Sequence, residues 1–181
     1  VVRKELIEAG KWANIGLGFE GAHGLNTGTV ARRSSSSWML TTTGIQGHSS
    51  QIFKEKLGYG AIFEATRILN AFREELVGEE YLSFNPGTIV GGTDVDYEPV
   101  TTRGTTFGKT NVVSQSATVH GGIRAISTEQ LDRAISRMKD IASQNLPGTT
   151  AKIKFKTSYP PMAPTKANYA LLDKLESVHM D

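Results

Sequence analysis

The chain has 181 residues, 38% of them hydrophobic, which is enough for one domain with a substantial core. Its 20 basic and 18 acidic residues give a net charge of only +2, and no long run of like charge indicates a nucleic-acid partner. The absence of cysteine excludes disulfides, thiolate metal sites and a cysteine nucleophile, so any metal must be bound by His, Asp or Glu. No apolar run reaches the roughly 18 residues of a membrane-spanning helix, so we also expect no membrane partner.

The first part of the chain predicts a helix, a short strand and a connector. Residues 3–13 have the helical spacing of apolar side chains, and residues 15–19 alternate as a strand that ends at Glu20. The segment from there to the serine run 34–37 is rich in Gly, Ser and Thr, which is typical of a connection between two bodies. Because the chain begins with valine, we expect it to be an excised or processed piece of a longer protein.

The middle of the chain alternates between the strand period of two and the helical period of three to four. In its first helix we expect Glu64 and Arg67 on the charged outer face, opposite the apolar stripe. The predicted elements are a strand at 37–46, a helix at 61–77, a strand at 81–91 broken by Pro86-Gly87, a polar loop at 94–108, a strand at 111–125, a helix that starts at the capping box 127–130 and ends before Pro147, and a strand at 150–156.

This order of elements predicts the fold. Two helices with one apolar stripe each, and strands with one apolar face each, require a two-layer packing. We therefore predict an α+β fold, a two-layer ferredoxin-like sandwich with a four-stranded antiparallel sheet and two helices on one face. A stiff proline segment at 159–164 and a last helix from Thr165 onward follow the sandwich.

The motifs that carry chemistry are sparse. The segment Gly44–Ser50 places His48 in a glycine-flanked turn after a strand, where an imidazole can titrate or donate near neutral pH, although a solvated turn histidine has the same pattern. The segment 104–110 resembles a phosphate-binding loop but has three rather than four residues between its glycines and precedes a strand. No His-Glu-x-x-His set or Gly-x-Ser-x-Gly elbow is present, so the residues alone indicate a binding or assembly module.

Four short motifs in chain order resemble a known family. They are the turn Gly44 to His48, the helix start Gly58-Tyr59-Gly60-Ala61-Ile62, the segment Asn111-Val112-Val113 and the strand end Ile123-Arg124. Together they resemble the lid, or dimerisation domain, of the dizinc metallopeptidases that include glutamate carboxypeptidase, acetylornithine deacetylase and succinyl-diaminopimelate desuccinylase. The resemblance implies three parts: residues 1–34 as a remnant of the catalytic body with a connector, 35–159 as the lid, and 160–181 as a linker and helix that lead back to the body.

The same resemblance implies roles for four residues. His48 would reach across a dimer to the partner's active site and hold the developing oxyanion. Asn111 and Arg124 would bind the terminal carboxylate of the substrate, and Glu20 would be the one zinc ligand retained. The residues alone also allow simpler readings: a surface salt bridge for Arg124, a turn-forming amide for Asn111, and exposed surface positions for Glu20 and for His120.

The function implied for the parent protein is zinc-dependent cleavage of an amide bond in a small peptide or an N-acyl amino acid, with water activated by two zinc ions. The other metal ligands and the catalytic base would lie outside this chain, so we expect this segment to bind no zinc and to be inactive. As partner we expect a second copy, paired through an edge strand and the first helix of the lid. The alternatives are a free-standing small-ligand or regulatory binding module of the same fold and, third, an enzyme complete in 181 residues.

Three positions depart from the family pattern. Gly47 stands where alanine is usual, Gly60 stands where asparagine is common, and the charged segment 53–57 replaces a proline-containing turn. The segment 94–108 has no counterpart in the family. These departures surround His48 and the start of the following helix, so they affect the residues nearest the expected substrate contacts.

Overall fold

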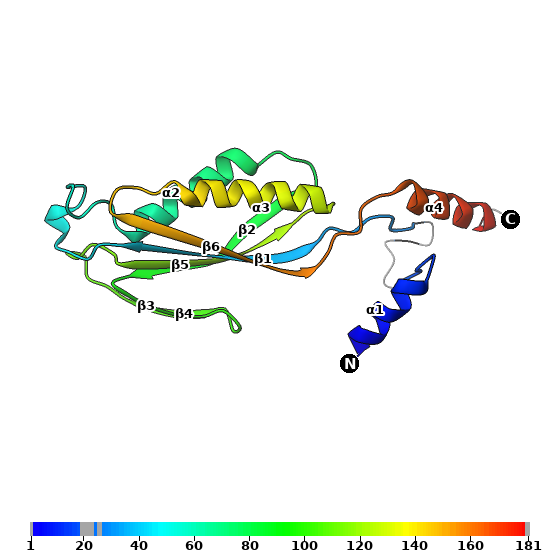
Figure 1. Cartoon of the computed structure of the whole chain (residues 1–181), viewed down its shortest axis with the longest axis horizontal. Helices are drawn as coiled ribbons and strands as arrows, with labels where there is room; N and C mark the ends of the chain where they lie inside the picture. Colours follow the sequence, from blue (N-terminus) through cyan, green and yellow to red (C-terminus); the bar gives the residue numbers. More distant parts are fainter. Residues whose placement is uncertain (1, 19–23, 25–26, 180–181) are drawn as a thin grey trace.

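A computed structural model describes residues 2–18, 24 and 27–179. Its body is a four-stranded antiparallel sheet, in the order β2-β5-β1-β6, with α2 and α3 on one face (Figure 1). The strand order and the two helices on one face confirm the predicted ferredoxin-like α+β sandwich. The elements are α1 (Val2–Trp12), β1 (Ser35–Gly44), η1 (Ser49–Gln51), α2 (Ala61–Leu76), β2 (Ser83–Gly92), β3 (Asp94–Glu98), β4 (Arg103–Phe107), β5 (Ser116–Arg124), α3 (Thr128–Ser143), β6 (Thr149–Tyr159) and α4 (Lys166–His179).

The core lies between the sheet and the two helices. Every second residue of β1 from Ser36 to Thr42 is buried, as expected for a strand with one face against a core. Trp38 meets Phe72 of α2 edge to face, with ring centroids 5.8 Å apart, and Met138 of α3 is fully buried beside them in the same cluster. The helix α3 begins at the predicted capping box, because Ser127 Oγ accepts from the Gln130 N–H at 3.1 Å.

Gly121 of β5 leaves the space that the indole ring of Trp38 fills. A Cβ at this position would lie 2.3 Å from Trp38 Cζ2 and 2.3 Å from the backbone oxygen of Asn85. We expect Gly121→Ala to lower the free energy of unfolding by about 1–3 kcal/mol, because neither the buried ring nor the strand backbone can move freely. Urea denaturation measures this loss. Gly122→Ala is the matched control, since a Cβ there would meet nothing closer than 3.8 Å, and an equal loss in both variants would contradict the explanation.

The prediction of a polar loop at 94–108 is wrong. Strands β3 and β4 form an antiparallel hairpin that lies below the sheet, on the face away from the helices (Figure 1). Tyr97 anchors the hairpin, because its hydroxyl lies 3.0 Å from Thr88 Oγ1 and 3.0 Å from Nδ1 of His120, which is half-buried rather than a plain surface residue. Half-buried Val95 and Tyr97 alternate with exposed acidic residues, so a period-two signal was present within a polar composition.

Two further expectations differ from the structure. The strand predicted at 111–125 begins only at Ser116, because residues 112 and 113 bond to the turn around His48 instead of the sheet. In the strand predicted at 15–19, residues 15–18 are exposed and form no strand, and Phe19 lies outside the described residues. Strand geometry needs a hydrogen-bonded neighbour, and alternation of apolar residues alone does not supply one.

Glu64 is also placed differently from the expectation, because it is fully buried instead of facing solvent. Its carboxylate accepts hydrogen bonds from Arg67 Nη2 at 2.7 Å, the Leu146 N–H at 2.9 Å and Asn145 Nδ2 at 3.2 Å. Burial by itself would raise the pKa of Glu64, but these hydrogen bonds outweigh it and hold the pKa below the ordinary 4.5. The carboxylate therefore ties α2 to the segment that follows α3.

The flanking segments leave the sandwich together at one end, where α1 and α4 lie (Figure 1). Arg32 and Met162 exchange two backbone hydrogen bonds of 2.9 Å, and Asn168 Nδ2 donates to the Val30 oxygen at 2.8 Å. Arg3 of α1 donates to the Ser158 oxygen at 2.7 Å. Among the described helices, including α1 and α4, none has the length and apolar character to cross a membrane.

Candidate functional site

His48 lies on a protrusion built from two loops, residues 45–60 and 109–115, which we call the His48 lobe. The two loops are joined by backbone hydrogen bonds of 2.9 Å from Ser49 N–H to the Asn111 oxygen and from Val113 N–H to the Gly47 oxygen. Val113 and Leu57 are the buried apolar residues of the lobe. The lobe therefore has a small packed interior that holds the backbone around His48.

The imidazole of His48 is exposed, and its own turn orients it. Nδ1 accepts from the Ser50 N–H at 3.3 Å and lies 2.9 Å from Ser50 Oγ, so the ring caps the short helix η1. Because Nδ1 accepts from an N–H group, the neutral ring carries its proton on Nε2. His48 thus presents an N–H donor away from its turn.

The glycines at the base of the lobe explain two of the departures from the family pattern. A Cβ at Gly47 would lie 2.6 Å from Leu57 Cδ1, so glycine lets this leucine close the lobe. Gly60 has φ 78° and ψ 160°, a conformation that is essentially restricted to glycine, and it precedes the first residue of α2. Gly44 packs against Gly60 at the start of α2, because a Cβ on Gly44 would lie 2.6 Å from Gly60 Cα.

The charged segment 53–57 closes as a turn without proline. Phe53 has φ 70°, and its N–H donates to the Gly58 oxygen at 2.8 Å. The Phe53 ring lies 5.1 Å from the ring of Tyr59 and 5.5 Å from that of Phe63, measured between centroids. Aromatic contacts and a backbone hydrogen bond thus hold the turn that proline would otherwise stiffen.

Asn111 lies on the same lobe as His48, whereas Arg124 does not. Asn111 is exposed, and its backbone oxygen accepts from the residue next to His48. Arg124 is exposed at the far end of β5, opposite Ser83. The eight residue steps from Ser116 to Arg124 span about 27 Å at strand geometry. One chain therefore presents His48 and Asn111 at one end of the sheet and Arg124 at the other.

Glu20, the expected metal ligand, lies outside the described residues. Within residues 2–18, 24 and 27–179, no group of three or more His, Asp or Glu side chains is placed to hold a metal ion. The described residues thus do not by themselves form a zinc site.

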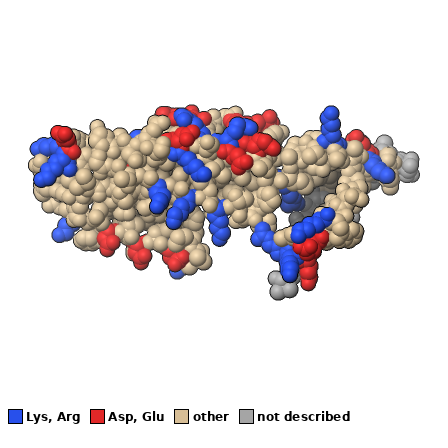
Figure 2. All heavy atoms as spheres, in the orientation of Figure 1, with Lys and Arg blue, Asp and Glu red and all other residues tan. Residues whose placement is uncertain are grey.

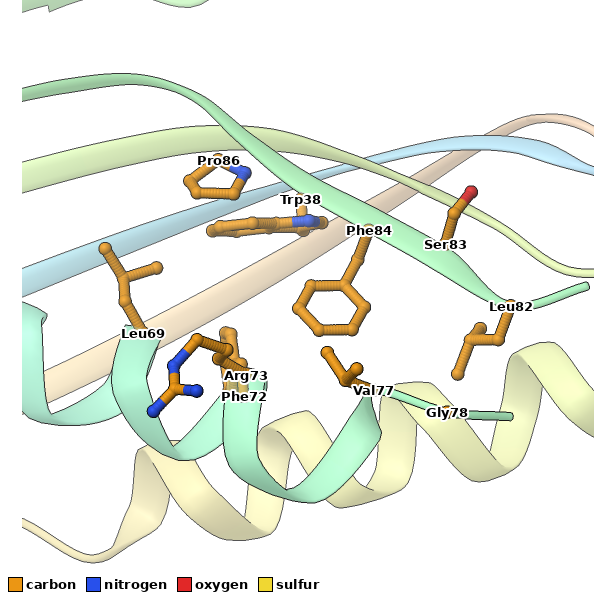
Figure 3. Close-up of a pocket in the computed structure, with 10 residues that line it drawn as sticks. All are labelled: Trp38, Leu69, Phe72, Arg73, Val77, Gly78, Leu82, Ser83, Phe84 and Pro86. Carbon is orange, nitrogen blue, oxygen red and sulfur yellow. The ribbon is translucent and has the colours of Figure 1, made fainter. Parts of the chain in front are cut away.

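The sequence did not indicate an apolar groove of about 460 Å³ between α2 and β2 (Figure 3). Figure 3 shows Trp38 at the base of the groove, side chains of α2 along one wall and side chains of β2 along the other. Finding the groove requires the spacing of a helix above an edge strand, which has no local signature. Its lining residues are Trp38, Leu69, Phe72, Arg73, Val77, Gly78, Leu82, Ser83, Phe84 and Pro86.

Solved structures share this fold. A tripeptidase from Staphylococcus aureus matches with a TM-score of 0.63 at 18% identity, covering 86% of this chain and 38% of that chain. The aminopeptidase PepT from Bacillus cereus matches with a TM-score of 0.57 at 18% identity, covering 78% of this chain and 34% of that one. An amidase of the hydantoinase/carbamoylase family from Burkholderia multivorans matches with a TM-score of 0.57 at 15% identity, covering 82% of this chain and 34% of that one.

At these identities the likeness concerns the fold, and this chain spans little more than a third of the length of the structures it matches. No curated protein matches the chain at a significant level. The family model described as peptidase dimerisation domain matches residues 30–150, which include the sandwich from β1 to α3 and only the beginning of β6. With two thirds of its residues covered by that model, the chain belongs to the family of peptidase dimerisation domains.

Proposed function

We propose that this chain is the lid and dimerisation domain of a zinc-dependent peptidase or amidohydrolase that cleaves an amide bond of a small peptide or an N-acyl amino acid. The observation that carries the proposal is the His48 lobe, in which backbone hydrogen bonds join the turn of His48 to the segment of Asn111, on a domain of the peptidase dimerisation family. The matched structures named as a tripeptidase, an aminopeptidase and an amidase support the reaction class. Residues 1–34 and 160–181 then lead from and to a catalytic body, and Glu20 is its one ligand in this chain.

The geometry supports a division of the substrate contacts between two copies. A tripeptide spans only about 10 Å, whereas β5 alone extends about 27 Å from the His48 lobe to Arg124, so one substrate does not reach both Asn111 and Arg124 of the same chain. We therefore assign His48 and Asn111 to the active site of the partner, and Arg124 to the active site of its own chain. Two copies pairing in opposite directions bring the lobe of one toward the Arg124 end of the other.

Each of these residues has a distinct chemical task. The Nε2–H of His48 donates to the oxygen that gains negative charge as the amide carbonyl is attacked. The side-chain amide of Asn111 donates to a neighbouring substrate oxygen, and the guanidinium of Arg124 binds the terminal carboxylate in a fork. Zinc would supply activated water when bound, with Glu20 as the one ligand from this chain and the other ligands from the catalytic body.

Light scattering on the 181-residue chain tests the assembly role. We expect the mass of two chains at high protein concentration, because the domain alone carries the pairing surface. A strict monomer at every concentration would contradict the assembly role and favour the free-standing binding module.

Purified chain with added zinc should hydrolyse no N-acyl amino acid, and clear turnover would instead support an enzyme complete in 181 residues.

A further inference from the structure

Three aromatic rings form a cluster on the His48 lobe and the first turn of α2. The ring of Phe53 lies 5.1 Å from that of Tyr59 and 5.5 Å from that of Phe63, measured between centroids. Phe53 and Phe63 are nevertheless 56% and 49% exposed, so about half of each residue stays open to solvent. Aromatic rings that contact one another and remain exposed are typical of a surface that binds an apolar group.

The tip of the lobe around this cluster is charged. Figure 2 shows charged side chains at the left end of the molecule, where the lobe lies in Figure 1. Lys54, Glu55 and Lys56 directly follow Phe53 in the sequence and are exposed. Charged side chains remain solvated at little cost, whereas an exposed phenyl ring gains free energy by contact with another apolar group. The aromatic cluster is thus the part of the tip that favours an apolar ligand.

The backbone that carries the rings is fixed by hydrogen bonds to other segments. The Tyr59 N–H donates to the Pro147 oxygen at 3.1 Å. The Ile62 N–H donates to Ser114 Oγ at 3.0 Å, which joins the first turn of α2, with Phe63, to the second loop of the lobe. Because the frame is already formed, a ligand on these rings does not have to order the backbone.

The rings lie within reach of a substrate held at His48. The chain turns tightly after this residue, since the Gln51 N–H donates to the His48 oxygen at 2.9 Å and the Lys54 N–H donates to the Gln51 oxygen at 3.2 Å. At the rise of about 2 Å per residue in such turns, the backbone from His48 to Phe53 advances about 10 Å. A tripeptide also spans about 10 Å. One substrate can therefore meet His48 with its reacting carbonyl and Phe53 with a more distant group.

Resting on the proposed function, we propose that Phe53 and Phe63 bind an apolar group of the substrate in the active site of the partner. Arg124 is assigned to the terminal carboxylate, so the acyl side of the amide bond is the side left for the two rings. The preferred substrates are then N-acyl amino acids or small peptides with an aromatic or other large apolar group on the acyl side. Tyr59 packs against Phe53 and supports its ring.

Steady-state kinetics of the complete polypeptide with zinc test this preference. The N-acetyl and N-phenylacetyl derivatives of one amino acid are compared, so that only the acyl group differs. Wild type should have a kcat/KM about 10-fold or more higher for the phenylacetyl derivative, because an apolar subsite discriminates by this much for a group that fills it. Phe63→Ala should lower this ratio about 5–10-fold, mainly through KM, and Phe63→Leu should retain most of it, because an apolar contact remains.

Phe53→Asn should lower the ratio by a similar factor. Asparagine is chosen because it tolerates the positive φ of 70° at this position better than alanine does. Tyr81→Asn is the matched control and should leave the ratio unchanged. Tyr81 is also 56% exposed and has φ 65°, but it follows α2 at the end of the sandwich away from the lobe. Far-ultraviolet circular dichroism confirms that each variant is folded.

The outcomes separate this inference from the proposed function. An equal kcat/KM for both derivatives in wild type, or an unchanged ratio in both phenylalanine variants, would overturn the role of the rings and leave the proposed function intact. Equal losses on both derivatives would also overturn it, because the rings would then support the site without contacting the acyl group. A wild type that hydrolyses no N-acyl amino acid and no small peptide would contradict the proposed function itself.

Discussion

His48→Ala in the complete polypeptide should lower kcat by about 10²–10³-fold, the usual cost of removing one donor to a developing oxyanion. The Nε2–H donor is lost, whereas the fold should remain, because the imidazole is exposed and bonds only to Ser50. Steady-state kinetics with an N-acyl amino acid or a dipeptide measures the change. Ser50→Ala is the matched control within the same turn, and it should cost much less, since it removes only a support of the ring.

Arg124→Ala should act on substrate binding, and its combination with His48→Ala tests the division of the site between two copies. Loss of the guanidinium should lower kcat/KM about 10–100-fold, mainly through KM. Neither variant alone is active at the normal rate. A mixed dimer of one His48→Ala chain and one Arg124→Ala chain, however, has one site that combines the intact Arg124 of the first chain with the intact His48 of the second. Random reassembly should therefore restore about one quarter of wild-type activity. No recovery on reassembly would contradict the assignment of these residues to opposite copies.

Glu64→Ala should lower the free energy of unfolding by about 3 kcal/mol at neutral pH. The buried carboxylate accepts from Arg67, Asn145 and the Leu146 N–H, and the substitution leaves these donors without their acceptor. Glu74→Ala changes an exposed carboxylate on the same helix and should stay within about 0.5 kcal/mol of wild type. Equilibrium urea denaturation of both variants gives the comparison. Similar losses in the free energy of unfolding would contradict a special role of Glu64 in stability.

The lowered pKa of Glu64 also predicts how the free energy of unfolding changes in acid. Its folded pKa lies below the ordinary 4.5 because hydrogen bonds from Arg67, Leu146 and Asn145 outweigh the opposing effect of burial. A lowered folded pKa means that this carboxylate stabilises the fold above pH 4.5 and that the contribution is lost as pH falls through the lowered value. The stability gap between wild type and Glu64→Gln should therefore narrow in acid. A gap that stays constant from pH 7 to about pH 3 would contradict this linkage.

The fold was largely predictable from the sequence, since hydrophobic periodicity reports directly which side of an element meets the core. The capping box at Ser127 and the alternation in β6 specify their elements through local geometry. The hairpin β3–β4 was not predicted, because the half-buried Tyr97 that anchors it is bonded to His120, a residue on another strand. The burial of Glu64 was not predicted for the same reason, because its partners Asn145 and Leu146 are about eighty positions away in the sequence.

The candidate site was likewise predictable from the sequence only in part. By itself the sequence determined the residue types: a histidine in a glycine-flanked turn, an asparagine at the start of a predicted strand and an arginine near the end of that strand. Only the tertiary structure decided that Asn111 joins the His48 lobe while Arg124 lies a strand length away, and that a groove opens beside α2. Local patterns report the shape of one element, whereas pairing register and the packing of helix on sheet depend on residues far apart in the chain.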